Sequence, residues 1–235
     1  MSYLNTKPLI YGFEQGMMKE TVELIIDYPA KIADALINDT IDIGLIPVAA
    51  IPKLKEYHIV SDYCISSDGE VASVCLFSEV PLEEIKTVLL DYQSRTSVAL
   101  AQILIKEFWK INPVIKNGEE DFRKEIKGST AAVVIGDRAL EQRKVSPYIY
   151  DLGEAWKQFT GKPFVFAAWV SNKYIEADFI KKFNEANLAG LQRIDEVVRL
   201  NPYLIFDLKS YYTQFINYSL TNIKRDALQQ FLLKL

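Results

Sequence analysis

The run FVFAAWV at residues 164–170 decides the fold, because it is a continuous apolar stretch that begins directly after a helix stop. Gly161 and Pro163 end the helical pattern before it, as residues of these types commonly do. Short uninterrupted apolar runs are typical of strands buried on both faces. A second run, VASVCLF at 71–77, has the same character. We predict that the chain leaves a first lobe through the earlier strand and returns through the later one.

Strand-like and helix-like segments alternate around these two runs, which indicates an α/β fold with a largely parallel sheet. The strand patterns cover 21–27, 41–46, 57–65, 71–77, 86–90, 131–135 and 164–170. The helical patterns cover 29–37, 47–50, 97–110, 138–143 and 155–160, and the chain from 176 onward is mostly helical. We expect one lobe from 1–76 plus 170–235 and the other from 77–169, with a ligand cleft between them.

Composition excludes several classes of protein. The 235 residues carry 27 Lys and Arg against 31 Asp and Glu, a net charge of −4, which argues against a nucleic-acid partner. No apolar run approaches the ~18 residues of a membrane helix, so no membrane partner is expected. The given sequence opens without a secretory signal pattern, and its two cysteines, Cys64 and Cys75, form no CxxC pair. We therefore expect two buried thiols and a cytoplasmic protein, and the oligomeric state stays open.

The chain contains a single histidine, His58, which restricts the chemistry. A catalytic triad or a histidine-rich metal site would have to be built around this one residue, and no HExxH motif accompanies it. We predict that His58 is a partly exposed strand residue and that the site uses neither imidazole nor metal.

The polar loop DYQSRTS at 91–97 joins a buried strand to the start of a helix. Unpaired backbone N–H groups at that helix start, with the side chains of Ser94, Arg95, Thr96 and Ser97, could hold a carboxylate or phosphate. The alternative is that Thr96 or Ser97 only caps the helix and Arg95 is solvated. The residues alone leave both interpretations open.

Two further loops follow other strands at equivalent positions, and Asn5 and Ser73 are separate candidates. Asp137 follows the 131–135 strand and could accept a hydrogen bond from a ligand or cap the next helix. Val48 lies in the loop after the 41–46 strand. Asn5, ahead of Pro8, could donate its amide to a ligand or occupy a turn. Ser73 is an isolated hydroxyl in an apolar strand, where it either bonds locally or faces the cleft.

Six segments, in this order along the chain, resemble the MqnA family, the chorismate dehydratases of the futalosine route to menaquinone. They are SYLNTKPL at 2–9, IPVAAI at 46–51, SDGEVASV at 67–74, SRTSVALAQ at 94–102, VVIGDRAL at 133–140 and DLGEAWKQFTGKPFVFAAW at 151–169. The resemblance implies a two-lobed fold of the periplasmic-binding-protein type II kind that closes on chorismate. It also implies removal of water from chorismate to give 3-[(1-carboxyvinyl)oxy]benzoate, with no cofactor.

Carried over residue by residue, the resemblance implies that Asn5 and Ser73 lie at the reacting end of the ligand. The loop from Ser94 to Ser97 would hold a carboxylate, and Asp137 would line the cleft. The substrate's own enolpyruvyl carboxylate is the implied proton acceptor, so the protein would act mainly by fixing geometry. Members of this family usually carry about seven more residues ahead of SYLN, ending in a strand. Either the given start is misplaced or trimmed, or the first lobe lacks that central strand.

Two alternatives have the same fold. A non-catalytic cytoplasmic protein could close on a small carboxylate without turning it over, because fold does not determine function. A sister enzyme makes 1,4-dihydroxy-6-naphthoate. The SRTS and GEAWKQFTG segments favour the dehydratase.

Overall fold

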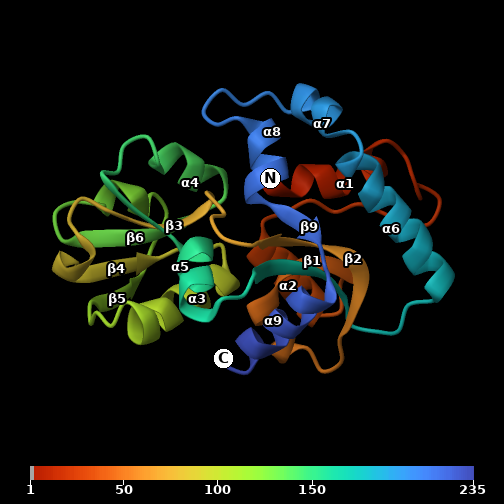
Figure 1. Ribbon diagram of the computed structural model, residues 1–235. Helices are drawn as coiled ribbons and strands as arrows, with labels where there is room; N and C mark the ends of the chain where they lie inside the picture. Colours follow the sequence, from red (N-terminus) through yellow and green to blue (C-terminus); the bar gives the residue numbers. More distant parts are fainter. Residues whose placement is uncertain (1–2) are drawn as a thin grey trace.

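Two separate sheets carry the strands of residues 3–235, the part of the chain that the computed structural model describes (Figure 1). The first sheet has the order β1 (Ile43–Pro47), β8 (Phe164–Ser171), β2 (His58–Ser67) and β9 (Asn217–Ser219). The second has the order β5 (Val114–Asn117), β4 (Thr87–Leu90), β6 (Thr130–Ile135), β3 (Val74–Ser78) and β7 (Tyr148–Asp151). The predicted α/β fold with two lobes is confirmed.

Helices cover both faces of the first sheet, as Figure 1 shows. On one face lie α1 (Lys7–Glu14) and α6 (Ala177–Leu191), and on the other α2 (Pro29–Ile37) and α9 (Asn222–Leu232). The second lobe carries α3 (Arg95–Ile103), α4 (Asp137–Gln142) and α5 (Leu152–Thr160). The remaining helices are α7 (Ile194–Leu200) and α8 (Leu208–Ser210), the π-helical turns η4 (Leu104–Phe108) and η6 (Tyr211–Phe215), and the 3₁₀ turns η1 (Leu4–Thr6), η2 (Val48–Lys53), η3 (Leu82–Glu84) and η5 (Phe122–Glu125).

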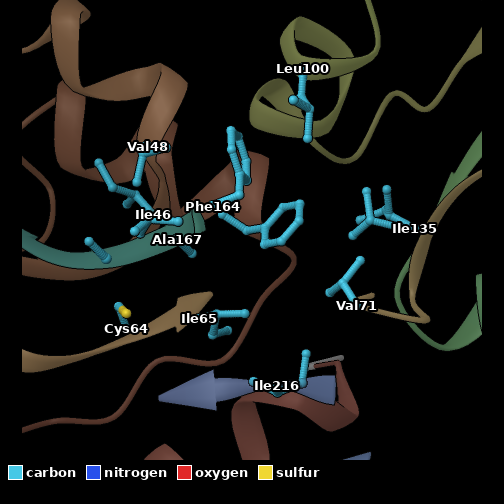
Figure 2. Close-up of a cluster of buried hydrophobic side chains, with 14 of the residues drawn as sticks. Ile46, Val48, Cys64, Ile65, Val71, Leu100, Ile135, Phe164, Ala167 and Ile216 are labelled. Carbon is cyan, nitrogen blue, oxygen red and sulfur yellow. The ribbon is translucent and has the colours of Figure 1, made fainter. Parts of the chain in front are cut away.

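One hydrophobic core runs through both lobes. Figure 2 shows part of this core, with Ile46, Cys64 and Phe164 on the side of the first sheet and Val71, Leu100 and Ile135 on the side of the second lobe. Both cysteines are free and buried, as predicted. Among residues 3–235, no helix has the length and apolar composition needed to cross a bilayer.

The two apolar runs do not themselves cross between the lobes. All of β3 pairs in the second sheet and all of β8 in the first, so the chain changes sheet within 68–73 and within 152–163. The expected lobe boundaries at 76/77 and 169/170 would therefore cut through β3 and β8. β8 lies between β1 and β2, and its apolar residues suit a strand that is buried on both faces. The whole run therefore stays within the first sheet.

The expectation of a largely parallel sheet is wrong. Every pairing in the first sheet is antiparallel, and in the second sheet β4 pairs parallel with β5 and β6 while β3 pairs antiparallel with β6 and β7. The strands β3 and β8 bring the chain into each sheet from the other lobe, so they run against their neighbours.

The expected strand at 21–27 does not form either. Residues 22–27 have no regular secondary structure and pair with no strand, and Ile25 and Ile26 are exposed. The elements α1, β5, β7 and β9 are additional to those predicted. His58 lies at the start of β2, partly exposed and 2.7 Å from Glu56 Oε1, as predicted for a strand residue.

Candidate active-site cleft

A narrow cleft of about 60 Å³ lies where the two lobes meet. Both lobes line it near the carboxyl ends of β1 and β6, the position where α/β proteins bind small ligands. The predicted residues Asn5, Ser94 and Ser97 are among its lining side chains, together with Phe166 and Ile135. The cleft expected between the lobes is therefore present.

Tyr3 fills part of this cleft and was not expected there. Its hydroxyl donates to Gln93 Oε1 in the second lobe. Its ring lies so close to Gly136 that a Cβ at that position would overlap it, and Gly136 has φ of +64°. Burial raises the pKa of the Tyr3 phenol, so this group stays protonated at neutral pH. Tyr3 thus joins the lobes across the site.

Residues of the SRTS loop both cap the N-terminus of α3 and line the cleft. Ser94 is the N-cap of α3, and its Oγ accepts from the Ser97 backbone N–H at 3.2 Å. The Ser94 hydroxyl also donates to Ser97 Oγ at 2.9 Å. The cap is therefore Ser94 rather than Thr96 or Ser97, and the two cleft-lining hydroxyls hold each other beside the positive end of the helix.

Arg95, Thr96 and Val48 are placed differently from the other predicted residues. Arg95 does not line the cleft and forms an ion pair at the surface with Asp34 of α2, at 2.6 Å. Thr96 Oγ1 accepts from Ala49 N at 3.1 Å and links α3 to η2. Val48 is fully buried in the core. These three residues support the walls of the cleft without lining it.

Ser73 is held by Tyr211, which the sequence did not single out. The Tyr211 hydroxyl donates to Ser73 Oγ at 2.6 Å, and both side chains are fully buried. Burial raises the pKa of Tyr211, and the hydrogen bond with Ser73 opposes that rise. Tyr218 donates to the Asn5 carbonyl at 2.9 Å. Of the two candidate catalytic residues, Asn5 lines the cleft and Ser73 is buried beside Tyr211 without lining it.

Asp137 holds the segment that carries Asn5. Its Oδ1 accepts from the Leu4 backbone N–H at 3.0 Å, although Gly136 occupies the cap position of α4. Burial raises the pKa of Asp137 to about 6, against the opposing effect of the Leu4 N–H. Tyr203 donates to the Asp137 carbonyl at 3.2 Å. Asp137 therefore lies beside the site and positions η1.

Asp151 positions Ser73 from the other side and is a second residue that the sequence did not single out. Its carboxylate accepts from the N–H groups of Val71 and Ala72, at 3.1 and 2.8 Å, and caps α5 through Gly153 and Glu154, at 2.9 and 3.1 Å. Ala72 has a strained φ of +62°. The signal was available, because an Asp directly before a helical pattern indicates an N-cap.

The tyrosines around the site come from the carboxyl-terminal part of the chain. Tyr203, Tyr211, Tyr212 and Tyr218 all lie beyond α7, and Tyr211 and Tyr212 belong to the π-helical turn η6. Their contacts with Asn5, Ser73 and Asp137 span 66 or more positions. No local pattern reports contacts over such distances, so the sequence carried no signal for them.

Comparisons with known proteins agree with this architecture. The family described as menaquinone biosynthesis matches residues 1–235. A protein named chorismate dehydratase from Thermus thermophilus is 27% identical over 217 residues, which cover 83% of this chain and 77% of that protein. Another of that name, from Campylobacter jejuni, is 25% identical over 233 residues, covering 97% and 88%.

Solved structures show the same fold at low identity. A crystal structure of an Archaeoglobus fulgidus protein has a TM-score of 0.77 and 13% identity, covering 99% of this chain and 93% of that one. The periplasmic aliphatic sulphonate binding protein SsuA from Escherichia coli has a TM-score of 0.60 and 13% identity, covering 97% and 82%. The predicted binding-protein-like fold is confirmed, and with the match over its full length the chain belongs to the menaquinone biosynthesis family.

Proposed function

We propose that this protein is a chorismate dehydratase, a cytoplasmic hydro-lyase that converts chorismate into 3-[(1-carboxyvinyl)oxy]benzoate. The family match and the two relatives of that name support the activity. The observation that carries the proposal is the cleft between the two lobes, which Asn5 lines together with Ser94 and Ser97.

The reaction needs a proton acceptor, and the lining residues point to the substrate itself. Among the described residues that line the cleft there is no Asp, Glu, His or Lys. Tyr3 is the one ionisable side chain among them, and burial keeps it protonated. In our proposal the enolpyruvyl carboxylate takes the C3 proton as the C4–O bond breaks. The carboxyl group then passes this proton to the departing hydroxyl, which leaves as water. The ring becomes aromatic, and no net oxidation occurs.

The protein then contributes position and hydrogen bonds. The hydroxyls of Ser94 and Ser97 and the N-terminal N–H groups of α3 would hold the ring carboxylate, which acidifies the C3 hydrogen through the conjugated double bond. Asn5 and Ser73 would orient the enolpyruvyl carboxylate or the departing hydroxyl. Fixing two groups in reacting geometry supplies up to about 7–11 kcal/mol in favourable cases.

Turnover of chorismate by the purified protein tests the proposal. We expect loss of one water and a new benzoate-type absorbance without added metal or cofactor. Asn5→Ala and Ser73→Ala should each lower kcat by about 100-fold or more, whereas the exposed Asn38→Ala should retain full kcat.

Two results would contradict this proposal. Wild-type kcat in both Asn5→Ala and Ser73→Ala would remove the assigned roles. Tight binding of chorismate without product would favour the alternative of a small-carboxylate receptor.

A further inference from the structure

The backbone at residues 71–73 forms a strained turn. The Ser73 N–H donates to the Val71 carbonyl at 2.7 Å, and Ala72 between them has a φ of +62°. A hydrogen bond of this span across a residue with positive φ defines a γ-turn of the rare kind, which an L-residue adopts only under strain. Ala72 is also fully buried. We call residues 71–73 the Ser73 turn.

The Ser73 turn contributes to the wall of the active-site cleft. Val71, within the turn, and Val74, directly after it, both line the cleft. The Ser73 hydroxyl, which accepts from Tyr211 at 2.6 Å, is the group for which we propose a role in the reaction. The conformation of the turn therefore places two side chains of the wall and this hydroxyl at once.

Every backbone polar group of the Ser73 turn has a hydrogen-bond partner. The Asp151 carboxylate accepts from the first two N–H groups, and the third N–H donates to the first carbonyl. The carbonyl of Ser73 accepts from the Gly136 N–H at 2.8 Å. The remaining carbonyl, that of Ala72, accepts from Arg143 Nη1 at 3.3 Å. A strained conformation persists where its surroundings fix it in this way, and such residues cluster at active sites.

Arg143, directly after α4, is the side chain through which the turn can be tested alone. Its Nη2 pairs with Glu70 Oε1 at 2.6 Å, and its side chain is 23% exposed. Asp151 also caps α5, and Gly136 contributes only its backbone. Substitution of Arg143 therefore releases the Ala72 carbonyl and leaves the cap of α5 in place.

We propose that Arg143 is a positioning residue for the reaction, because it holds the Ala72 carbonyl and so keeps the Ser73 turn in its strained shape. This inference rests on the proposed function. Arg143 does not line the cleft, so it acts through the turn. Without its hydrogen bond, Ala72 relaxes toward a negative φ, which moves both Val71 and the Ser73 hydroxyl.

A double-mutant cycle between Arg143→Met and Ala72→Gly tests this role. Arg143→Met should lower kcat for chorismate about 10-fold or more, with KM changed less than about 3-fold. Ala72→Gly removes the strain, because glycine adopts a positive φ freely, so the turn no longer needs Arg143. The double variant should therefore have a kcat within about 3-fold of Ala72→Gly alone. The exposed Arg199→Met is the matched control and should leave kcat unchanged.

Amide hydrogen exchange tests the same contact without any activity. Arg143→Met should speed the exchange of the Ser73 and Gly136 amides about 10-fold, and adding Ala72→Gly should slow it again. If the wild type does not turn over chorismate, the proposed function is wrong, while these rates still decide whether Arg143 holds the turn. If Arg143→Met does not fold, Arg143→Lys replaces it, because lysine keeps the charge but lacks the fork of two nitrogens.

Three results would overturn the proposal. A wild-type kcat in Arg143→Met would show that holding the turn does not serve the reaction. Unchanged exchange at both amides would show that Arg143 does not hold the turn. A loss of kcat that Ala72→Gly leaves uncorrected would assign the effect to the packing of α4 or to the charge beside Asp151.

Discussion

The Ser73 hydroxyl has a single proton, and Tyr211 determines where that proton can go. Because the Tyr211 O–H donates to Ser73 Oγ at 2.6 Å, the Ser73 proton remains for another acceptor. The Val71 carbonyl is a poor competitor at 3.4 Å. We therefore expect Tyr211→Phe to lower kcat for chorismate by about 10- to 100-fold, because the buried hydrogen bond that orients Ser73 is lost. KM should change little, and steady-state kinetics measures both values.

Tyr212→Phe is the matched control for this substitution. Tyr212 is the neighbouring buried tyrosine, and its hydroxyl has no hydrogen-bond partner among the described residues. Its removal should leave kcat unchanged. If both variants lose the same activity, the effect belongs to packing of η6 and not to the Ser73 hydrogen bond.

Asp137 should make stability depend on pH. Burial raises its pKa from 3.8 to about 6, so the native state holds a proton that the unfolded chain has already released between these values. The contribution is complete below the unfolded pKa and is lost as pH rises through about 6. Relative to Asp137→Asn, the wild type should lose about 2 kcal/mol of unfolding free energy between pH 4 and 7.

Urea denaturation at several pH values measures this difference. The exposed Asp178→Asn should leave the pH profile of the wild type unchanged. A wild-type profile parallel to that of Asp137→Asn would mean that Asp137 ionises normally in the folded protein.

At the scale of elements, one carboxylate joins α5 to the turn before β3. Asp151 accepts from four backbone N–H groups, two at 71–72 and two in the first turn of α5. Asp151→Ala leaves these buried donors without a partner, so the unfolding free energy should fall by about 2–4 kcal/mol. The exposed Asp68→Ala breaks only the surface pair with Lys157 and should cost under about 1 kcal/mol. Equal losses of unfolding free energy in the two variants, measured by urea denaturation, would show that Asp151 does not hold α5 to the turn at 71–72.

Local sequence patterns correctly predicted the elements that do not depend on contacts with distant parts of the chain. Pro29 marks the start of α2, and the apolar run at 164–170 is almost the whole of β8. The pattern at 21–27 is also that of a strand, but pairing depends on a partner far away in the chain, and none is present in the described part. The three-residue strand β9 was missed for the same reason, because β2 holds it from 150 or so positions away.

In the candidate site, the positions of some residues were likewise predicted from local patterns, but the directions of their side chains were not. The position of a loop after a strand brought Ser94 and Ser97 to the cleft, because strand ends share one edge of a sheet. The direction of a side chain within a loop depends on its partners, which is why Arg95 turned to Asp34 instead. The catalytic and binding roles of these residues stay predictions.

At the scale of the molecule, the lobes must separate before a ligand enters. A cleft of about 60 Å³ is far below the ~300 Å³ and more of typical ligand sites. Polar contacts that join the lobes around it include Arg95 with Asp34, Thr96 with Ala49, Asp137 with Leu4, Tyr3 with Gln93 and Tyr203 with Asp137. The Arg95–Asp34 contact is an ion pair at the surface, with Asp34 53% exposed.

This surface pair should act as a weak latch on the closed state. An exposed ion pair stabilises by at most about 1 kcal/mol, so Asp34→Asn should raise the population of open lobes, and the association rate of chorismate, by no more than about 5-fold. Stopped-flow tryptophan fluorescence measures that rate. The gain should vanish at high salt, since screening weakens the wild-type pair equally. Asp42→Asn, which breaks a surface pair with Lys173 inside the first lobe, should leave the rate unchanged. A rate for Asp34→Asn equal to that of Asp42→Asn at low salt would show that opening does not depend on the Arg95–Asp34 pair.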